Sequence, residues 1–344
     1  MSAELLATIF IALMGLAILV YAIADGYDLG VGILLPLNKK YSSGTAPENC
    51  HHTDANRDRM IASIGPFWDA NETWLVLAVG ILLIAFPKAH SVVFYHLYLP
   101  ATLMLAGLIL RGVSFDFRAK TSVGQKPLWD AAFKFGSILT STCQGYMLGR
   151  YVLGFDDSWQ ASAFAFLSGL GMTAAYALIG AAWLVYKTEG RLQQQAKHWL
   201  IAFNRITFAG VLAVSIANIW VNPSVFERWL ASPSMWLTAL IPIICFALFA
   251  LIEYWLAHRP HQKVHDITPL LLVMGIFILC FFGLGFSFFP YIVPGQLTIW
   301  QTASAPESLQ FILIGTVIVV PTIGAYTAYS YWVFRGKATA LSYE

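Results

Sequence analysis

The sequence has little charge, since only 11% of its 344 residues are Asp, Glu, Lys or Arg. Soluble domains carry about 25% charged residues. Hydrophobic residues make up 58% of the chain, and a soluble fold could not bury that much apolar surface. The composition therefore excludes an ordinary soluble domain and indicates a membrane protein.

Cysteine and clustered basic residues are also scarce. The four cysteines are scattered and form no C-x-x-C pair, so neither a disulfide framework nor a metal framework is predicted; they are Cys50, Cys143, Cys245 and Cys280. No basic block suggests nucleic acid. Residues 1–6 contain no Lys or Arg, whereas a secretory signal begins with a basic region. We therefore expect the first apolar run to be a retained helix.

Long apolar runs dominate what the sequence does contain. Runs of about 18 or more apolar residues are long enough to cross a membrane as helices. They are continuous rather than alternating, which favours helices over a β-barrel. The sequence predicts one all-α, polytopic integral membrane domain over residues 1–344, with about nine spans at 5–35, 61–86, 92–113, 131–153, 161–186, 200–220, 235–257, 270–289 and 309–334.

The distribution of positive charge predicts the orientation. Of the 20 Lys and Arg residues, 14 follow the odd-numbered spans, and the opposite connections hold only Lys88, Arg150 and Arg228. Cytoplasmic loops carry the excess of Lys and Arg. We therefore expect the N-terminus outside, the C-terminus in the cytoplasm, and residues 38–59 as a cytoplasmic loop.

Histidine is missing from the middle of every predicted span. The eight histidines fall in loops or at helix ends: His51, His52, His90, His96, His198, His258, His261 and His265. A low-spin haem needs an axial ligand within the membrane. The sequence therefore predicts that this chain ligates neither haem nor another metal.

Ionisable residues within the first three spans form the most informative group. In the predicted orientation all of them fall toward the cytoplasm: Asp25, Asp28, Asp69, Glu72, Arg111 and Asp116. Asp69 and Glu72 are three residues apart and share a helix face. Amides within spans are expected to form helix-to-helix hydrogen bonds; they are Asn71, Gln144, Asn204 and Asn218.

This acidic group has two interpretations. A charged side chain at the centre of a membrane helix costs about 2.5–3.5 kcal/mol on insertion scales, so it usually has a partner or a water path. One interpretation is a proton or cation inlet from the cytoplasm, with Asp69 as the deepest acid in a polar cavity. The other is a salt-bridge network that fixes helix packing, in which Arg111 pairs with Asp28 or Asp116.

Five stretches in matching order resemble subunit II of the bd-type quinol oxidases, most of all the shorter, cyanide-insensitive branch. They are residues 25–32 (DGYDLGVG), 63–75 (SIGPFWDANETWL), 111–118 (RGVSFDFR), 289–291 (FPY) with Pro294, and 325–337 (AYTAYSYWVFRGK). The resemblance implies two four-helix bundles plus a peripheral helix. It also implies a heterodimer with subunit I in a bacterial cytoplasmic (inner) membrane.

The resemblance further implies an activity for the complex. The complex would oxidise membrane quinol and reduce oxygen to water, which is electrogenic without pumping if the protons come from the cytoplasm. Two b-type haems and one d-type haem would sit in subunit I. Some members bind a quinone in subunit II, and some complexes have small single-helix accessory subunits; both points stay open for this chain.

The resemblance places a proton path at Asp69 with Trp68 and gives Asp28 and Arg111 a supporting role. Together with the acidic group, it predicts a proton path made of Asp69, Trp68, Glu72 and Asp25. Structural ion pairs are predicted among Asp28, Arg111 and Asp116. One departure is Gln301, where relatives commonly have an aspartate, so a carboxylate role there is in doubt.

Two other functions compete with the oxidase. The acidic group also fits a stand-alone, proton- or cation-coupled secondary transporter, for which broken helices near mid-membrane would be expected. The Gly and Pro interruptions here lie mostly at predicted helix ends. The third possibility is a purely structural membrane subunit. Haem absorbance that co-purifies with a second large subunit would distinguish the oxidase from the transporter.

Overall fold

The computed structural model describes residues 1–37, 48–221, 223–230, 235–258 and 266–338. Nine helices in the described part have 18 or more residues: α1 (Ala3–Leu34), α3 (Trp68–Ala85), α4 (Pro87–Lys120), α5 (Lys126–Val152), α6 (Trp159–Lys187), α7 (Gly190–Val221), α9 (Met235–His258), α10 (Thr268–Phe288) and α12 (Pro306–Val333). Eight of the nine are long and apolar enough to cross a membrane. The exception is α5, which is rich in Ser, Thr and Gly. The prediction of an all-α membrane protein with about nine long helices is confirmed.

Shorter elements connect these helices. They are α2 (Glu48–Ala62), the 3₁₀ turn η1 (Val123–Gln125), α8 (Pro223–Leu230), β1 (Tyr291–Val293), β2 (Leu297–Thr298) and α11 (Ile299–Thr302). The two strands pair antiparallel as a small hairpin between α10 and α12. The hydropathy pattern did not predict this hairpin, because its apolar residues continue the run of the preceding helix.

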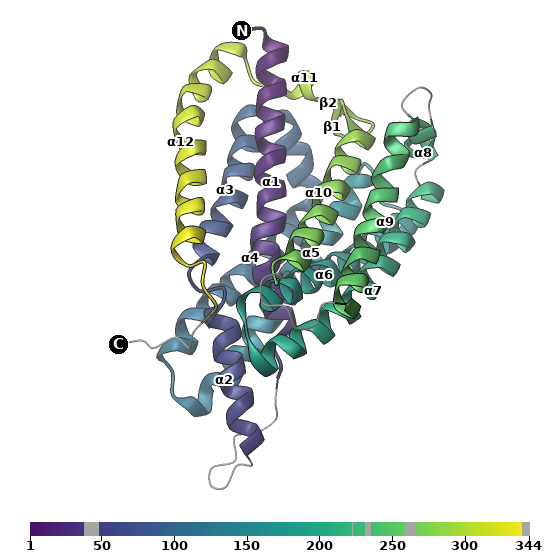
Figure 1. Cartoon of the computed structure of the whole chain (residues 1–344). Helices are drawn as coiled ribbons and strands as arrows, with labels where there is room; N and C mark the ends of the chain where they lie inside the picture. The colour runs from purple at the N-terminus through teal and green to yellow at the C-terminus, as the bar shows by residue number, and fades with distance from the viewer. Residues whose placement is uncertain (38–47, 222, 231–234, 259–265, 339–344) are drawn as a thin grey trace.

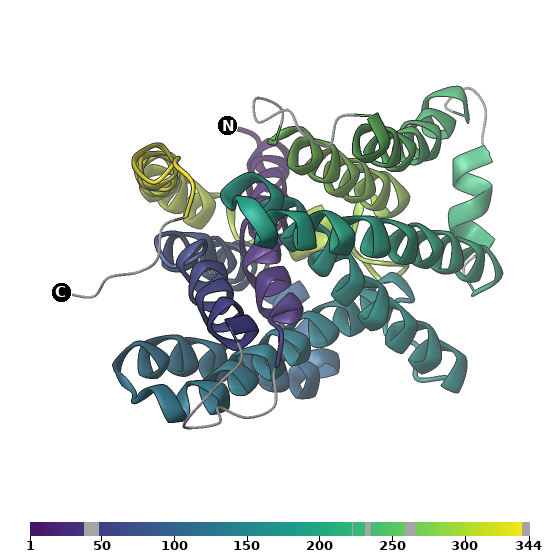
Figure 2. The same cartoon turned by 60° about the horizontal axis from the view of Figure 1, so that its bottom comes forward.

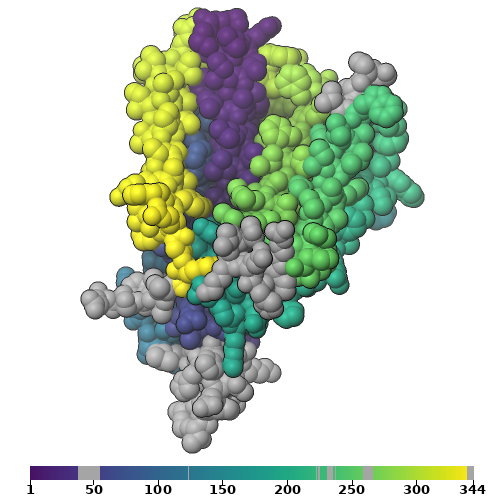
Figure 3. Space-filling view, viewed as in Figure 1, coloured from purple at the N-terminus to yellow at the C-terminus, as the bar shows by residue number. Residues whose placement is uncertain are grey.

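The long helices form two groups and one outlier (Figure 1). One group packs α1, α3, α4 and α5 together, and the other packs α6, α7, α9 and α10. The two groups meet where α1 and α5 lie against α6. Figure 2 shows α12 at the edge of the molecule, where it touches α3 and α1. Figure 3 shows α12 as a separate ridge beside α1.

Glycine sets the spacing between α1 and α6. A Cβ built on Gly30 would lie 1.9 Å from the carbonyl oxygen of Tyr176, and one on Gly180 would lie 2.4 Å from the carbonyl carbon of Gly30. No side chain fits between the two backbones at this point. Close approach through small residues is a common way to pack membrane helices, because lipid supplies no hydrophobic driving force between them.

One predicted span began too early. The span expected at 61–86 is divided in the structure, because α2 ends at Ala62 and α3 begins at Trp68. Pro66 lies in the turn between them, and proline has no N–H to continue a helix. The predicted loop at 38–59 is also partly wrong, since its second part belongs to α2; residues 38–47 lie outside the described part.

The two ends of the bundle differ. The N-terminus of α1 lies at one end, and the C-terminal end of α12 lies at the other, next to α2 (Figure 1). The N-terminal half of α1 packs in one apolar cluster with α3, whereas its C-terminal half packs in another with α6. Asp25 and Asp28 of α1 lie in that second half, toward the α2 end.

Candidate functional site

Two aspartates of α1 and one arginine of α4 form the centre of the site. Asp25 and Asp28 are three residues apart on α1, so they lie on adjacent turns of one face. Both are 0% exposed, and Arg111 is 2% exposed. The Nη1 atom of Arg111 lies 2.7 Å from Oδ1 of Asp25, and its Nη2 atom lies 3.8 Å from Oδ2 of Asp28. Arg111 therefore binds Asp25 closely and Asp28 more loosely.

Asn71 of α3 joins this centre from the side. Its amide nitrogen donates to Oδ2 of Asp28 at 2.7 Å and lies 2.8 Å from the hydroxyl of Tyr27 and 3.3 Å from the carbonyl oxygen of Ala24. Asn71 is fully buried. A neutral amide thus supplies the shortest hydrogen bond that Asp28 receives in the described part of the chain.

The C-terminal helix α12 reaches the same centre through a tyrosine. The hydroxyl of Tyr331 donates to Oδ1 of Asn71 at 3.0 Å and lies 2.6 Å from the hydroxyl of Tyr27. Tyr27 in turn stacks on Trp183 of α6, with ring centroids 3.9 Å apart. The aromatic and hydroxyl groups of α1, α6 and α12 therefore enclose the polar centre on this side.

A second polar chain extends from the centre toward α6. Tyr21 lies one turn before Asp25 on α1, and the two side chains are within hydrogen-bonding reach. Gln144 of α5 donates to the Tyr21 hydroxyl at 2.6 Å and accepts from the Tyr176 hydroxyl at 2.7 Å. Side chains from six helices (α1, α3, α4, α5, α6 and α12) thus belong to one polar network.

The remaining predicted acids lie outside this network. Glu72 is half-buried and close enough to Asp25 and Asp69 for their charges to interact. Asp69 and Asp116 are both exposed on the isolated chain. Neither has an ion pair within the ranges that the structure describes. The structure therefore brings together Asp25, Asp28 and Arg111, while Asp69 and Asp116 point outward.

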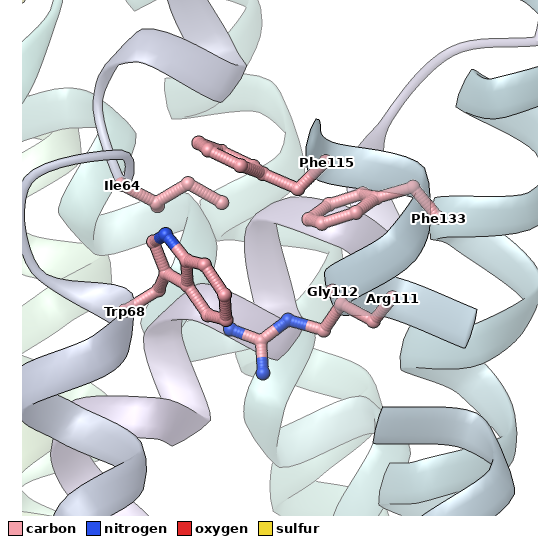
Figure 4. Close-up of a pocket in the computed structure, with 6 residues that line it drawn as sticks. All are labelled: Ile64, Trp68, Arg111, Gly112, Phe115 and Phe133. Atoms are coloured by element: carbon pink, nitrogen blue, oxygen red, sulfur yellow. The ribbon is translucent and has the colours of Figure 1, made fainter. Parts of the chain in front are cut away.

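Trp68 lies at the contact between the buried centre and the turn after α2. It lines a narrow pocket together with Arg111 and Gly112, and three apolar side chains complete the lining: Ile64, Phe115 and Phe133 (Figure 4). In Figure 4 the indole ring of Trp68 lies beside the guanidinium group of Arg111. Asp69 does not line this pocket, so the polar cavity expected around Asp69 stays a prediction.

A second ionic network lies toward the α2 end. Asp130 of α5 is fully buried and lies 3.0 Å from Nη1 of Arg57 and 2.5 Å from Nε of Arg118. Arg118 also lies 2.8 Å from Asp58 of α2. These contacts hold the polar helix α2 against α4 and α5. The sequence did not single out Asp130, because it lies at the edge of a predicted span.

The predicted amide contacts are largely present. Besides Asn71 and Gln144, Asn204 of α7 donates to the carbonyl oxygen of Phe249 on α9. The side-chain oxygen of Asn218 has no hydrogen-bond partner in the described ranges. Asn71 was predicted only as a helix-to-helix contact, and its place beside two buried acids could not be read from spacing along α3.

Three of the described histidines have rings that contact aromatic side chains of this chain. The ring of His96 stacks on Phe155 with centroids 4.9 Å apart, and those of His90 and His258 stack on neighbouring aromatic rings. No cluster of three or more His, Cys, Asp or Glu that could hold a metal ion occurs in the part of the chain that the structure describes. His261 and His265, and the side chains of His51, His52 and Cys50, lie outside that part.

The arrangement is suited to binding and moving protons. Buried carboxyls and phenol hydroxyls can exchange protons, whereas the guanidinium of Arg111 stays protonated and can hold a neighbouring carboxyl ionised. Asp69 and Asp116 are exposed and Glu72 is half-buried, and all three lie toward the α2 end of their helices.

Comparisons with a family model and with known relatives agree on one protein family. The family model described as cytochrome bd terminal oxidase subunit II matches residues 6–334. Cytochrome bd-I ubiquinol oxidase subunit 2 of Escherichia coli is 25% identical, with 98% of this chain and 96% of the relative covered. Cytochrome bd ubiquinol oxidase subunit 2 of Bacillus subtilis is 25% identical, with 92% and 91% covered.

The fold has a counterpart among solved structures. A chain of the bd oxidase from Geobacillus thermodenitrificans superimposes with a TM-score of 0.74, covering 96% of this chain and 99% of the other. The two sequences are 17% identical over the match. At that identity the likeness concerns the fold, including the two helix groups and the outlying α12.

Proposed function

The chain belongs to the family of cytochrome bd terminal oxidase subunit II, and from this we propose that it works as the second subunit of a membrane quinol oxidase. In the complex, quinol is oxidised and oxygen is reduced to water. The match over almost the whole chain supports this proposal. The eight apolar helices fit a multi-pass protein of the bacterial inner membrane.

We assign the haems to subunit I, as two b-type groups and one d-type group. The position of the histidines supports this assignment, because the described ones lie toward helix ends and three of them stack on aromatic rings of this chain. The haems would supply the electron transfer and the site of oxygen reduction. Whether a quinone or a small single-helix subunit also binds to this chain stays a prediction.

We propose that this subunit supplies protons from the cytoplasm. The positive-inside rule makes the α2 end the cytoplasmic one, since most Lys and Arg residues lie on that side in the predicted topology. Water formation consumes protons, so a path must lead from one aqueous side to the haem site. The acidic residues of α1, α3 and α4 gather toward the α2 end, where such a path would begin.

Asp69 is the proposed entrance of the path, with Trp68 next to it and Glu72 and Asp25 further in. The exposure of the Asp69 side chain is the observation that supports this assignment. Asp69 lies in the first turn of α3, exposed and without an ionic partner in the described ranges, although an acid at membrane depth needs a partner or water. We propose that subunit I covers this face of α3 and that Asp69 passes protons across the interface.

The substitution Asp69→Asn tests the path. It keeps the shape of the side chain and removes its ability to release a proton. We expect oxygen consumption with a quinol donor to fall by about 100-fold, the low end of the loss expected for a positioned proton-transfer group. Because Asp69 has no ionic partner in the described part of this chain, the haem content and yield of the complex should not change.

Asp116→Asn is the matched control, since Asp116 is an exposed acid near the same end of α4. It should keep turnover near that of the unaltered complex. If an assembled Asp69→Asn complex turned over as fast as the Asp116→Asn control, Asp69 would not be part of the path. If both variants were equally slow, the effect would be one of surface charge rather than of a specific relay.

A further inference from the structure

The buried centre contains more negative than positive charge. Asp25 and Asp28 are two carboxyls without exposure, and among the described residues Arg111 is the one cation that contacts them. The charged groups near enough to act on Asp28 are Arg111, Asp25 and Glu72, and Glu72 is also an acid. With both aspartates ionised, a water-excluded site would keep an uncompensated negative charge, which is costly.

The two carboxyls are not equivalent. Asp25 makes a direct, charge-assisted contact of 2.7 Å with Arg111, whereas the Asp28 contact of 3.8 Å is too long for a hydrogen bond. The short hydrogen bond to Asp28 comes from the neutral amide of Asn71. Arg111 therefore compensates the charge of Asp25 far better than that of Asp28.

Unused polar atoms face into the same centre. Oδ1 of Asp28, Oδ2 of Asp25 and Nη2 of Arg111 are buried and have no hydrogen-bond partner among the described residues. An ionised carboxyl can only accept hydrogen bonds, whereas a protonated carboxyl has an O–H donor and can still accept. One proton on this carboxyl pair would neutralise the excess negative charge. It would also turn one of the unpartnered carboxyl oxygens into an O–H group that can donate a hydrogen bond.

We infer that the Asp25–Asp28 pair binds one exchangeable proton, which Asp28 carries while Asp25 stays ionised against Arg111. Two carboxyls that share a site with a single cation cannot both ionise easily. This inference rests on the proposed function, because it makes Asp28 a proton store beside the path that serves oxygen reduction. Release breaks the O–H bond of Asp28 and passes the proton to a neighbouring carboxylate or water, leaving Asp28 as the anion.

The groups around Asp28 favour a store over a permanently neutral acid. From α3 it faces Asn71 and the half-buried Glu72, from α4 Arg111, and from its own helix Asp25 and Tyr27. Arg111 is near enough to stabilise Asp28 as an anion after a small shift. The hydroxyl of Tyr331, a half-buried residue of α12, reaches Asn71 and Tyr27 and links the centre to the edge of the molecule.

Infrared difference spectroscopy of the assembled oxidase tests the inference. A protonated carboxyl has a C=O band separate from those of carboxylates and amides, and the band shifts when H₂O is replaced by D₂O. We expect the unaltered complex to show one such band that Asp28→Asn removes. Asp116→Asn is the control and should leave it in place. Identical carboxyl bands in the unaltered and Asp28→Asn complexes would overturn the inference.

If Asp28→Asn fails to assemble, Asp28→Glu gives the second test. The band should then move in frequency, because the protonated acid has changed, and an unmoved band would contradict the assignment. The outcome is independent of Asp69. Loss of the band in Asp28→Asn together with normal turnover in Asp69→Asn would support the proton store and reject the proposed entrance. An unchanged band in Asp28→Asn together with slow turnover in Asp69→Asn would reject the proton store and support the entrance.

Discussion

Arg111 shows how a single residue connects assembly to function. It is 2% exposed and contacts two buried aspartates of another helix. Breaking a buried ion pair is far more costly than losing a surface pair, because the partner charge is left in a medium that cannot solvate it. The sequence predicted an ion pair of Arg111 with Asp28 or Asp116, and the closest contact in the structure is with Asp25.

Truncating Arg111 should therefore impair assembly. We expect Arg111→Ala to destabilise the subunit by about 3–5 kcal/mol, the usual cost of leaving a buried charge without its partner. The measurement is the yield and thermal stability of the purified complex. Arg205→Ala is the control, because Arg205 pairs with Glu253 at the exposed surface of α7 and should be replaced with little effect. Normal yield of Arg111→Ala would show that the aspartates do not depend on it.

At the scale of elements, the molecule depends on the contact between α1 and α6. Gly30 and Gly180 let the two backbones touch, and this contact joins the two helix groups. It also positions the site, because Asp25, Tyr27 and Asp28 lie on the turns just before Gly30. A change in the spacing of these helices would therefore move the carboxyls relative to Arg111.

Gly30→Ala should separate α1 from α6, since the added methyl group would overlap the backbone of Tyr176. Overpacking costs about 1–3 kcal/mol and more where backbone cannot move away. The expected result is a lower midpoint of thermal unfolding and reduced oxidase turnover. Gly315→Ala on α12 is the matched control, because a Cβ there meets nothing within 4 Å. Equal stability of the two variants would show that the contact is not tight in the membrane.

Small connecting elements also decide where functional residues lie. Pro66 and the turn around it separate α2 from α3, so that Trp68 and Asp69 fall in the first turn of α3. Near the other end of the bundle, the side chain of Gln301 accepts from the backbone N–H of Thr298 at 2.9 Å and caps α11. At this position the chain therefore has a neutral residue with a local structural contact.

The molecule as a whole is built to sit against a partner. An outward-facing acid within a predicted span, such as Asp69, needs cover that the described part of this chain does not give. A tagged form of the chain should therefore bring down a second large subunit, and the purified material should show haem absorbance. Heat treatment that separates the subunits should leave this chain colourless. A colourless single subunit with transport activity would instead favour the alternative of a secondary transporter.

The sequence alone determined the class, the helices and the general position of the acids. Apolar runs longer than the hydrocarbon thickness can hardly be anything but membrane helices, because unpaired backbone groups are too costly in lipid. Depth along a helix then follows from 1.5 Å per residue, which places Asp25 about 33 Å along α1. These are properties of one segment at a time, so they can be read without a structure.

Only the tertiary structure decided which of these residues meet. Depth does not fix rotation about the helix axis, and a rotation of half a turn exchanges a buried residue for an exposed one. Asp25 and Asp69 were both predicted in the proton path, yet one is buried against Arg111 and the other points outward. Asn71 and Tyr331 are 260 residues apart in the chain and meet through a hydrogen bond. Such contacts depend on how whole helices pack, and therefore on many residues far from the site.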